Sequence, residues 1–112
     1  MSLNLSHSDH DGYALIAVSG ELDLATAHEL AALGARVVMT GASNVIVDAN
    51  ELAFCDSSGL RVLVQIANDL HPSGGKLVIA GAKPIVLRVL EITGLTDTVV
   101  LADTVPEAAA TL

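Results

Sequence analysis

Apolar residues in several parts of the chain are spaced as in β-strands. Residues 3–8 predict a weak edge strand and Tyr13–Ser19 a stronger one, with the turn Asp11-Gly12 between them. Three later stretches, rich in aliphatic and β-branched residues, predict further strands: Val45–Val47, Leu77–Ala80 and Val99–Leu101. The stretch Val45–Val47 is apolar at every position, which is typical of a strand buried on both faces of a sheet.

Between these strands the apolar spacing becomes helical. Four helices are predicted: from Asp23 or Thr26 to about Met39, from Ser57 to Leu70, from Ile85 to Thr93, and from Pro106 to Leu112. Glycines and prolines mark their ends, at Gly41, His71–Gly75, Pro84 and Gly94. This alternation implies an α/β sandwich with a mixed, mostly parallel sheet of about five strands and about four helices. We expect residues 1–112 to form one such domain, without a linker or a repeat.

The helix predicted over Ile85–Thr93 is almost wholly apolar, because only Arg88 and Glu91 are obviously polar in it. Such a helix is either mostly buried or presents apolar surface to a partner. Burial within the domain is the default expectation. Contact with a partner, or association of two copies into a homodimer, is the alternative.

The composition is that of a folded but acidic chain. Hydrophobic residues make up 52% and charged residues 16%, which favours folding, and an aromatic content of 2% requires an aliphatic core. The net charge is −8 and the five basic residues are scattered, which argues against binding to nucleic acid or an anionic membrane. We recognise neither a signal peptide nor an apolar run of the ~20 residues that a membrane span needs. The single cysteine cannot form an internal disulfide, so a cytoplasmic protein is expected.

The densest group of chemically active side chains is the run Cys55-Asp56-Ser57-Ser58-Gly59, between an apolar strand and a helix. Asp56 and Ser57 are both good N-cap residues, since their side chains accept hydrogen bonds from free N–H groups of the helix. Gly59 is unfavourable in a first helical turn, and we expect it to give the backbone of another molecule close access.

Ser57 is expected to be an exposed hydroxyl at the positive end of that helix. Free N–H groups and the helix dipole would favour a phosphoryl group there, which adds about −1.5 to −2 charges. Phosphorylation would then switch the binding of a partner without unfolding the chain. An ordinary helix cap followed by a spare serine is the alternative, and the residues alone do not choose between Ser57 and Ser58.

Five segments match the conserved motifs of one family in the same order. They are Gly20–Asp23 as the turn after the second strand, Val45–Ala49 as the central strand, Phe54–Leu60 as a phosphorylation loop, Gly75–Ile79 as the next strand, and Leu90–Leu95 as the end of the third helix. Together they resemble the STAS-domain family, and within it the stand-alone anti-sigma factor antagonists. Several motifs in register over about a hundred residues are far more specific than a single one.

The resemblance implies a regulatory binding protein that takes part in transcription control, as in stress responses. The unmodified protein would bind an anti-sigma factor that is also an ATP-dependent serine kinase, and would thereby release a sigma factor. Phosphorylation of the loop serine, which matches Ser57 rather than Ser58, would end the interaction, and a metal-dependent phosphatase would restore it. ATP and Mg²⁺ would belong to the kinase, so no cofactor is expected here. The partner-binding residues are expected to be Asp23, Asp56, Ser57, Ser58, Gly59 and Arg61.

Two other function classes stay open. An enzyme with Ser57 as nucleophile would need a general base within reach. The G-x-S-x-G pattern is absent because Cys55 stands at its first glycine, so no catalytic residue is expected. A scaffold or transporter-associated STAS module would act by shape alone, although such relatives lack the serine pair that follows Asp56 here. Arg61, where family members often carry a small residue, places a positive charge beside the loop and could also pair with a phosphate.

Four further residues or segments have simpler interpretations. Asp23 is expected to cap the first helix, and Asp48 to be a solvated carboxylate at the end of the central strand. Cys55 is expected to be a buried, inert thiol, because no nearby cationic residue would lower its pKa. The segment His7–Asp11 resembles a metal-binding tract, but no second cluster accompanies it and no metal site is expected.

Overall fold

The computed structural model describes residues 2–94 and 98–112. Its elements, in chain order, are β1 (Leu3–His10), β2 (Tyr13–Leu22), α1 (Ala27–Met39), β3 (Val45–Cys55), α2 (Ser57–Leu70), the short 3₁₀ helix η1 (His71–Ser73), β4 (Leu77–Ala80), α3 (Pro84–Ile92), β5 (Val100–Ala102) and α4 (Val105–Ala110). The strands form one sheet in the order β1-β2-β3-β4-β5. β1 is antiparallel to β2, and the other neighbouring pairs are parallel. The predicted α/β architecture with a mixed, mostly parallel sheet is confirmed.

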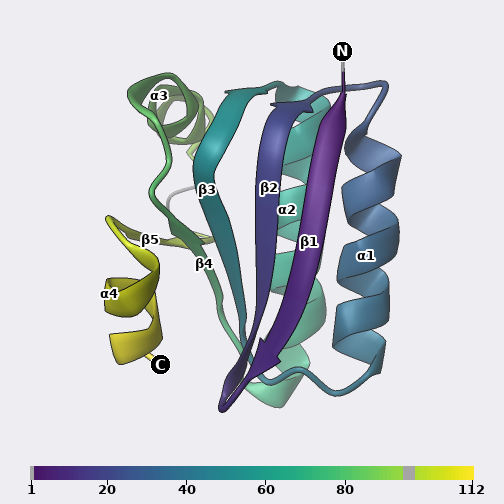
Figure 1. The fold of residues 1–112 in the computed structure, drawn as a ribbon, viewed down its shortest axis with the longest axis vertical. Helices are drawn as coiled ribbons and strands as arrows, with labels where there is room; N and C mark the ends of the chain where they lie inside the picture. Colours follow the sequence, from purple (N-terminus) through teal and green to yellow (C-terminus); the bar gives the residue numbers. More distant parts are fainter. Residues whose placement is uncertain (1, 95–97) are drawn as a thin grey trace.

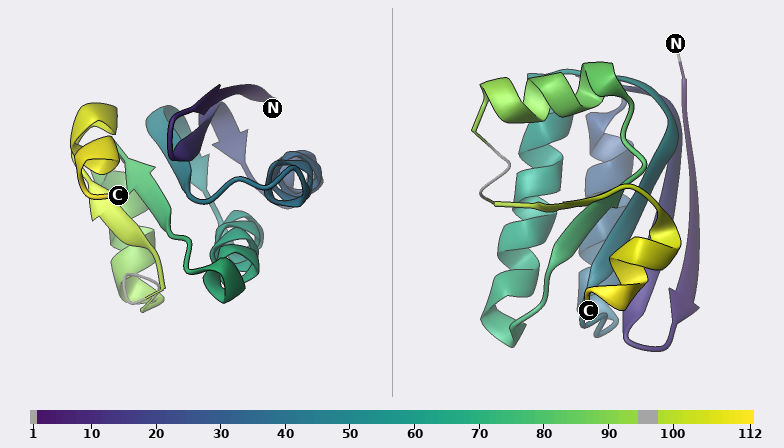
Figure 2. Two further views of the ribbon diagram at one scale, coloured as in Figure 1. Left: turned by 90° about the horizontal axis from the view of Figure 1, so that it is seen from below. Right: turned by 90° about the vertical axis from the view of Figure 1, so that its left-hand side faces the viewer.

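Helices cover both faces of the sheet. α1 and α2 lie on one face and α4 lies on the other, while α3 crosses one end of the molecule (Figures 1 and 2). The main core is aliphatic and lies under α1 and α2. A smaller cluster of Ile46, Val78, Ala80 and Ala108 lies under α4. No helix in the described part of the chain is both long and apolar enough to cross a bilayer.

The carboxyl ends of β2 and β3 meet at one edge of the sheet, at the top of Figure 1. Parallel α/β sheets bring the loops that follow their strands together at this edge. The β2–α1 turn and the β3–α2 junction, which are 32 residues apart in the chain, therefore lie side by side here. This arrangement places Asp23 next to the run that contains Ser57.

β3 is much longer than predicted. It pairs with β4 only over Val45–Asp48, but it continues beside β2 as far as Cys55. The prediction that Asp48 ends the central strand was therefore wrong: Asp48 is half-buried in mid-strand and accepts hydrogen bonds from the backbone and side chain of Asn50 at 3.1 and 2.7 Å. Sequence patterning missed the second half of the strand because two register shifts in its pairing with β2 interrupt the alternation of polar and apolar positions, and Asn50 and Glu51 are exposed.

α3 is neither wholly buried nor wholly exposed. Val86 and Leu90 are buried in the main core, whereas Ile85 and Ile92 are exposed. The default expectation of burial is thus correct for one side of the helix only. The predicted helix end at Gly94 is confirmed, since its φ of +74° is one that glycine adopts readily. Leu95, the last residue of the matching segment, lies outside the described residues.

Candidate functional site

Asp56 holds the candidate site together. Its backbone is extended, and its Oδ1 atom accepts hydrogen bonds from the N–H groups of Ser58 and Gly59 at 2.9 and 3.1 Å. Its Oδ2 atom accepts a third hydrogen bond from the N–H of Leu24 at 3.1 Å. Asp56 is therefore the N-cap of α2 and at the same time fixes the β2–α1 turn against the start of that helix.

Asp23 caps the helical turn that leads into α1. Its Oδ1 atom accepts hydrogen bonds from the N–H groups of Ala25 and Thr26 at 3.0 and 3.1 Å, and from the Thr26 hydroxyl at 3.1 Å. The Thr26 hydroxyl also lies 2.8 Å from the carbonyl oxygen of Glu21, and its Oγ1 atom accepts a hydrogen bond from the N–H of Asp23 at 3.0 Å. Of the two predicted caps, Thr26 is the N-cap residue of α1 but its side chain makes no capping hydrogen bond to that helix, whereas Asp23 accepts hydrogen bonds from N–H groups of the preceding turn. Asp23 and Asp56 thus lie on either side of Leu24.

The two serines of the run differ in accessibility. Ser57 is the first residue of α2 and is exposed, whereas Ser58 is half-buried. Within the described residues, the Ser57 hydroxyl has no hydrogen-bond partner. Ser57 is therefore open to contact with another protein.

The N–H groups at the start of α2 are largely occupied, which corrects one expectation. Asp56 accepts the hydrogen bonds of Ser58 and Gly59, and its own carbonyl oxygen accepts that of Leu60 at 3.0 Å. A phosphoryl group on Ser57 would thus find the favourable N–H groups already bound to a carboxylate, and would be close to that negative charge. The prediction of free N–H groups at this site was wrong for Ser58 and Gly59.

Gly59 has a different role from the one expected. It is buried, and a Cβ atom at this position would lie 2.5 Å from Leu22 Cγ and 2.9 Å from Cys55 Sγ. Real Cβ atoms do not approach other atoms so closely, so only glycine lets the first turn of α2 pack against the end of β2. The expectation that its missing side chain makes room for another molecule was therefore wrong.

Cys55 lies beneath the site and is buried, as expected, with 3% of its surface exposed. Burial, and after it the neighbouring Asp56 carboxylate, raises the pKa of the Cys55 thiol to about 12. The thiolate is the reactive form of cysteine, and it is scarcely populated here at neutral pH.

Three residues of the site were missed by sequence analysis. Leu24 is 79% exposed and Phe54 is 42% exposed, which is unusual for such large apolar side chains. Glu21 pairs with Phe54 across the β2–β3 ladder, and its Oε2 atom is buried without a hydrogen-bond partner in the described structure. An available signal was that Phe54 is the single phenylalanine of the chain.

Arg61 lies one helical turn after Ser57 on α2. It is exposed, and it forms no hydrogen bond or ion pair with any described residue. Five of the six predicted partner-binding residues therefore gather at this edge with accessible or half-buried side chains, namely Asp23, Asp56, Ser57, Ser58 and Arg61. The sixth, Gly59, is buried beneath them.

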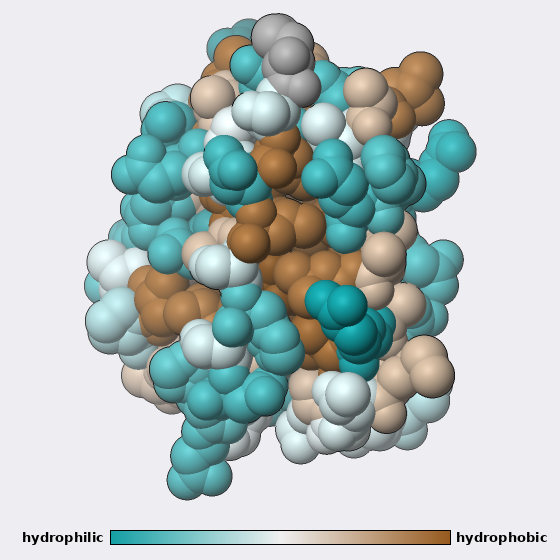
Figure 3. All heavy atoms as spheres, turned by 45° about the vertical axis from the view of Figure 1, so that its right-hand side comes forward, coloured by the Kyte–Doolittle hydropathy of each residue, from teal (hydrophilic) through white to brown (hydrophobic). Residues whose placement is uncertain are grey.

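Two other surface features lie apart from this site. A groove between β1 and α1 is lined by Leu5 and Leu33, with Glu29 and Arg36 on its rim. Figure 3 shows this side of the molecule, where apolar atoms form a strip between polar ones. Ser57 does not line the groove.

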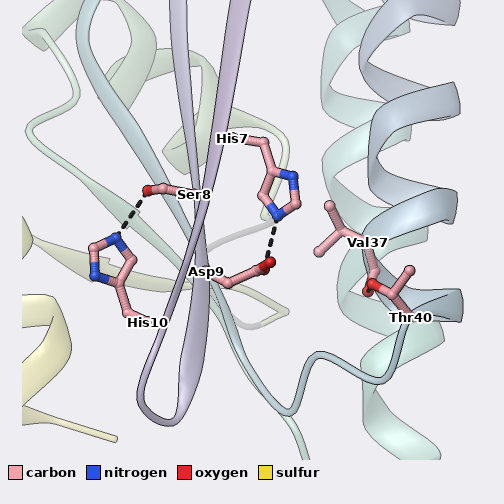
Figure 4. A network of polar contacts seen from close by, with 6 residues as sticks. All are labelled: His7, Ser8, Asp9, His10, Val37 and Thr40. Carbon is pink, nitrogen blue, oxygen red and sulfur yellow. Dashed lines mark hydrogen bonds and ion pairs between the residues drawn. The ribbon is translucent and has the colours of Figure 1, made fainter.

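The histidines of the predicted metal-like tract are separated by the geometry of β1. His7 pairs with Asp9, with Nε2 and Oδ1 2.9 Å apart, while the nitrogen of His10 lies 2.8 Å from the hydroxyl of Ser8. Figure 4 shows the two pairs on opposite sides of the strand, as expected when side chains alternate. The strand thus does not bring both histidines to one site, and no group of three potential metal ligands occurs among the described residues.

Comparison with known proteins identifies the family to which the fold and the five sequence motifs belong. The sequence profile of the STAS domain matches residues 4–108. The chain belongs to the STAS-domain family. Its fold, with α1 and α2 on one face of a five-stranded mixed sheet, agrees with this assignment.

Relatives within the family are anti-sigma factor antagonists by name. The chain is 31% identical over 97 residues to the anti-sigma-B factor antagonist of Staphylococcus aureus, covering 87% of this chain and 90% of that one. It is 32% identical to the BtrV protein of Bordetella bronchiseptica, covering 96% and 93% of the two chains. An anti-sigma factor antagonist from Mycobacterium paratuberculosis has a similar crystal structure, with a TM-score of 0.87, 30% identity, and coverage of 98% and 93%. The resemblance predicted from the five motifs is confirmed.

Proposed function

We propose that this protein is an anti-sigma factor antagonist that is controlled by phosphorylation of Ser57. The observation that carries the proposal is the placement of an exposed serine hydroxyl on the first residue of α2, beside a turn fixed by Asp56. The names of its relatives support the same function. The unmodified protein would bind an anti-sigma factor in the cytoplasm and so release the sigma factor for transcription.

The surface around Ser57 suits a protein partner. The exposed side chains of Leu24 and Phe54 offer apolar contact area, and the same segments carry the half-buried acidic residues Asp23 and Asp56. Exposed apolar residues with a polar rim are typical of protein interfaces. The partner surface is therefore expected to combine an apolar pocket with basic side chains, in keeping with the net charge of −8 of this chain.

Phosphorylation would act on this surface directly. In the proposed reaction the partner kinase transfers the γ-phosphoryl group of ATP to the Oγ atom of Ser57, which loses its proton, and ADP leaves. The product adds about −1.5 to −2 charges to an already acidic surface. Because Ser57 is exposed, the modification need not disturb the core, and it weakens binding by bulk and desolvation at the interface. A metal-dependent phosphatase would reverse it; ATP and Mg²⁺ belong to the kinase.

The deciding experiment incubates the purified protein with its candidate anti-sigma kinase and ATP-Mg²⁺, and maps phosphate by mass spectrometry. One phosphate on Ser57 is expected, absent in Ser57→Ala and retained in Ser58→Ala. The unmodified protein should bind the kinase and the modified protein should not. Persistent binding without phosphorylation would instead support a scaffold that acts by shape alone, and the absence of both would contradict the proposal.

A further inference from the structure

Arg61 has no role in the fold that the structure reveals. Its side chain is exposed, and it pairs with no carboxylate among the described residues, although the chain carries 13 acidic residues. Leu60 and Leu63 of the same helix are buried, so packing accounts for them. Arg61 therefore needs an explanation that involves something other than the unmodified domain.

The position of Arg61 on the helix supplies one. Residues four apart on an α-helix lie on the same face, with Cβ atoms about 5–6 Å apart. Side chains in a helix lean toward its N-terminus, so Arg61 reaches back over the first turn, where Ser57 stands. An acidic group that precedes a basic one by four residues is also the more favourable order for such a pair.

We propose that the Arg61 guanidinium binds the phosphoryl group of phosphorylated Ser57 within the same chain. The inference rests on the proposed function only in taking Ser57 as the modified residue. Guanidinium and phosphate form strong, frequently bidentate hydrogen bonds. The pairing is non-covalent, and it neutralises part of the charge that phosphorylation adds.

The surroundings of Ser57 favour such a receptor. Asp56 already occupies the N–H groups of Ser58 and Gly59, so they are not available to the phosphate. The charged groups of the neighbouring turn and strand are also acidic, namely Asp23 and Glu21. Arg61 is the one basic residue of α2, so without it a doubly charged phosphate next to Asp56 would have no cation on its own helix.

The other lysine and arginine residues lie on other elements of the fold. Arg36 lies in the last turn of α1 and Lys76 directly precedes β4, and both positions are at the end of the sheet away from Ser57. Lys83 and Arg88 belong to α3 or its N-cap, a separate element at the same end of the molecule. Two of them provide matched controls: Arg36 is at the far end of the sheet, and Arg88 is at the same end as Ser57.

The test uses protein in which phosphoserine is incorporated at position 57 during translation, so that no kinase is required. Titration of the phosphate followed by ³¹P NMR reports its second pKa, which is ordinarily about 6. Loss of Arg61 in Arg61→Gln should raise this pKa by about 0.2 to 0.4 of a unit in low salt, because the dianion loses its cationic partner. The shift should shrink in 1 M salt, which screens exposed charges. Arg36→Gln and Arg88→Gln should leave the pKa unchanged.

A second readout separates this role from a structural one. When position 57 is serine, Arg61→Gln should have the melting temperature of the wild type. When position 57 is phosphoserine, Arg61→Gln should have a lower melting temperature than the wild type with phosphoserine at the same position. Arg61→Lys should restore part of both effects. An equal phosphate pKa in wild type and Arg61→Gln, or a shift caused by Arg88→Gln instead, would overturn the assignment. Because the phosphate is encoded, these outcomes do not depend on whether a kinase modifies Ser57, and failure of the proposed function is detected separately by the kinase assay.

Discussion

The carboxylate of Asp56 accepts a hydrogen bond from the backbone N–H of Leu24, which lies 32 residues earlier in the chain. With its other oxygen the same carboxylate caps α2. One side chain thus determines both the start of the helix that carries Ser57 and the position of the exposed leucine beside it. The proposed partner surface depends on this link, because Leu24 lies in the β2–α1 turn whereas Ser57 begins α2.

Replacing Asp56 by alanine should destabilise the domain. Three N–H groups lose their acceptor, two at the start of α2 and one at Leu24. Loss of an N-cap alone costs about 0.5–2 kcal/mol, and we expect a decrease near the upper end of that range. Urea unfolding followed by circular dichroism measures the change. Asp56→Asn keeps one acceptor oxygen and should lose less, so equal losses for both variants would contradict the capping role.

Substitutions of Ser57 should separate binding from folding. Ser57→Ala should keep the wild-type melting temperature and bind the anti-sigma kinase persistently, since the hydroxyl has no partner within the described structure. Ser57→Asp should keep the same melting temperature but bind more weakly, because it adds a negative charge at the interface.

Calorimetric titration with the kinase gives the affinities, and Ser58→Ala serves as the neighbouring control. Early melting of both Ser57 variants would show that this serine is a structural cap. Loss of binding in Ser57→Ala would argue against the loop as a regulated contact surface.

The regular elements of this fold could be predicted because their patterns are local. The aliphatic run at Val45–Val47 reflects a strand that is buried within the sheet. The apolar stripe of the helix that begins at Ser57 reflects the packing of one side of that helix on the same sheet. The second half of β3 escaped prediction because its pairing with β2 is irregular. Two register shifts, between Ala17 and Ser19 and between Gly20 and Glu21, interrupt the alternation of polar and apolar positions there.

The candidate site could be predicted in its residues but not in its contacts. The run from Cys55 to Gly59 is conspicuous in the sequence, and Asp23 follows from the family resemblance. The bond from Leu24 to Asp56 and the packing of Gly59 against Leu22 depend on the parallel pairing of β2 with β3. Such contacts between distant segments leave no local pattern, which is why the role of Gly59 was assigned incorrectly.

Replacing Gly59 by alanine should destabilise the domain although alanine is the better helix former. Its Cβ atom would collide with the side chains of Leu22 and Cys55. Overpacking of this kind typically costs about 1–3 kcal/mol, against a gain of up to about 1 kcal/mol in helix propensity. Urea unfolding measures the balance. In a Leu22→Ala background the collision with Leu22 is relieved, so the same substitution should cost less there. An equal cost in both backgrounds would refute the packing explanation.

The buried thiol of Cys55 should make stability depend on alkaline pH. Its pKa is raised from an ordinary value of 9.0 to about 12, mainly because burial disfavours the thiolate. In the unfolded chain the thiol ionises above pH 9, whereas the folded chain retains the proton, so the free energy of unfolding falls as pH rises from about 9 toward 12. The slope contributed by this group approaches about 1.4 kcal/mol per pH unit, and the loss at pH 10 is also about 1.4 kcal/mol. Cys55→Val lacks this group, so its stability relative to wild type should improve by that amount between pH 7 and pH 10, as measured by urea unfolding at both values. A constant difference between the two proteins would show that the thiol titrates normally in the folded state.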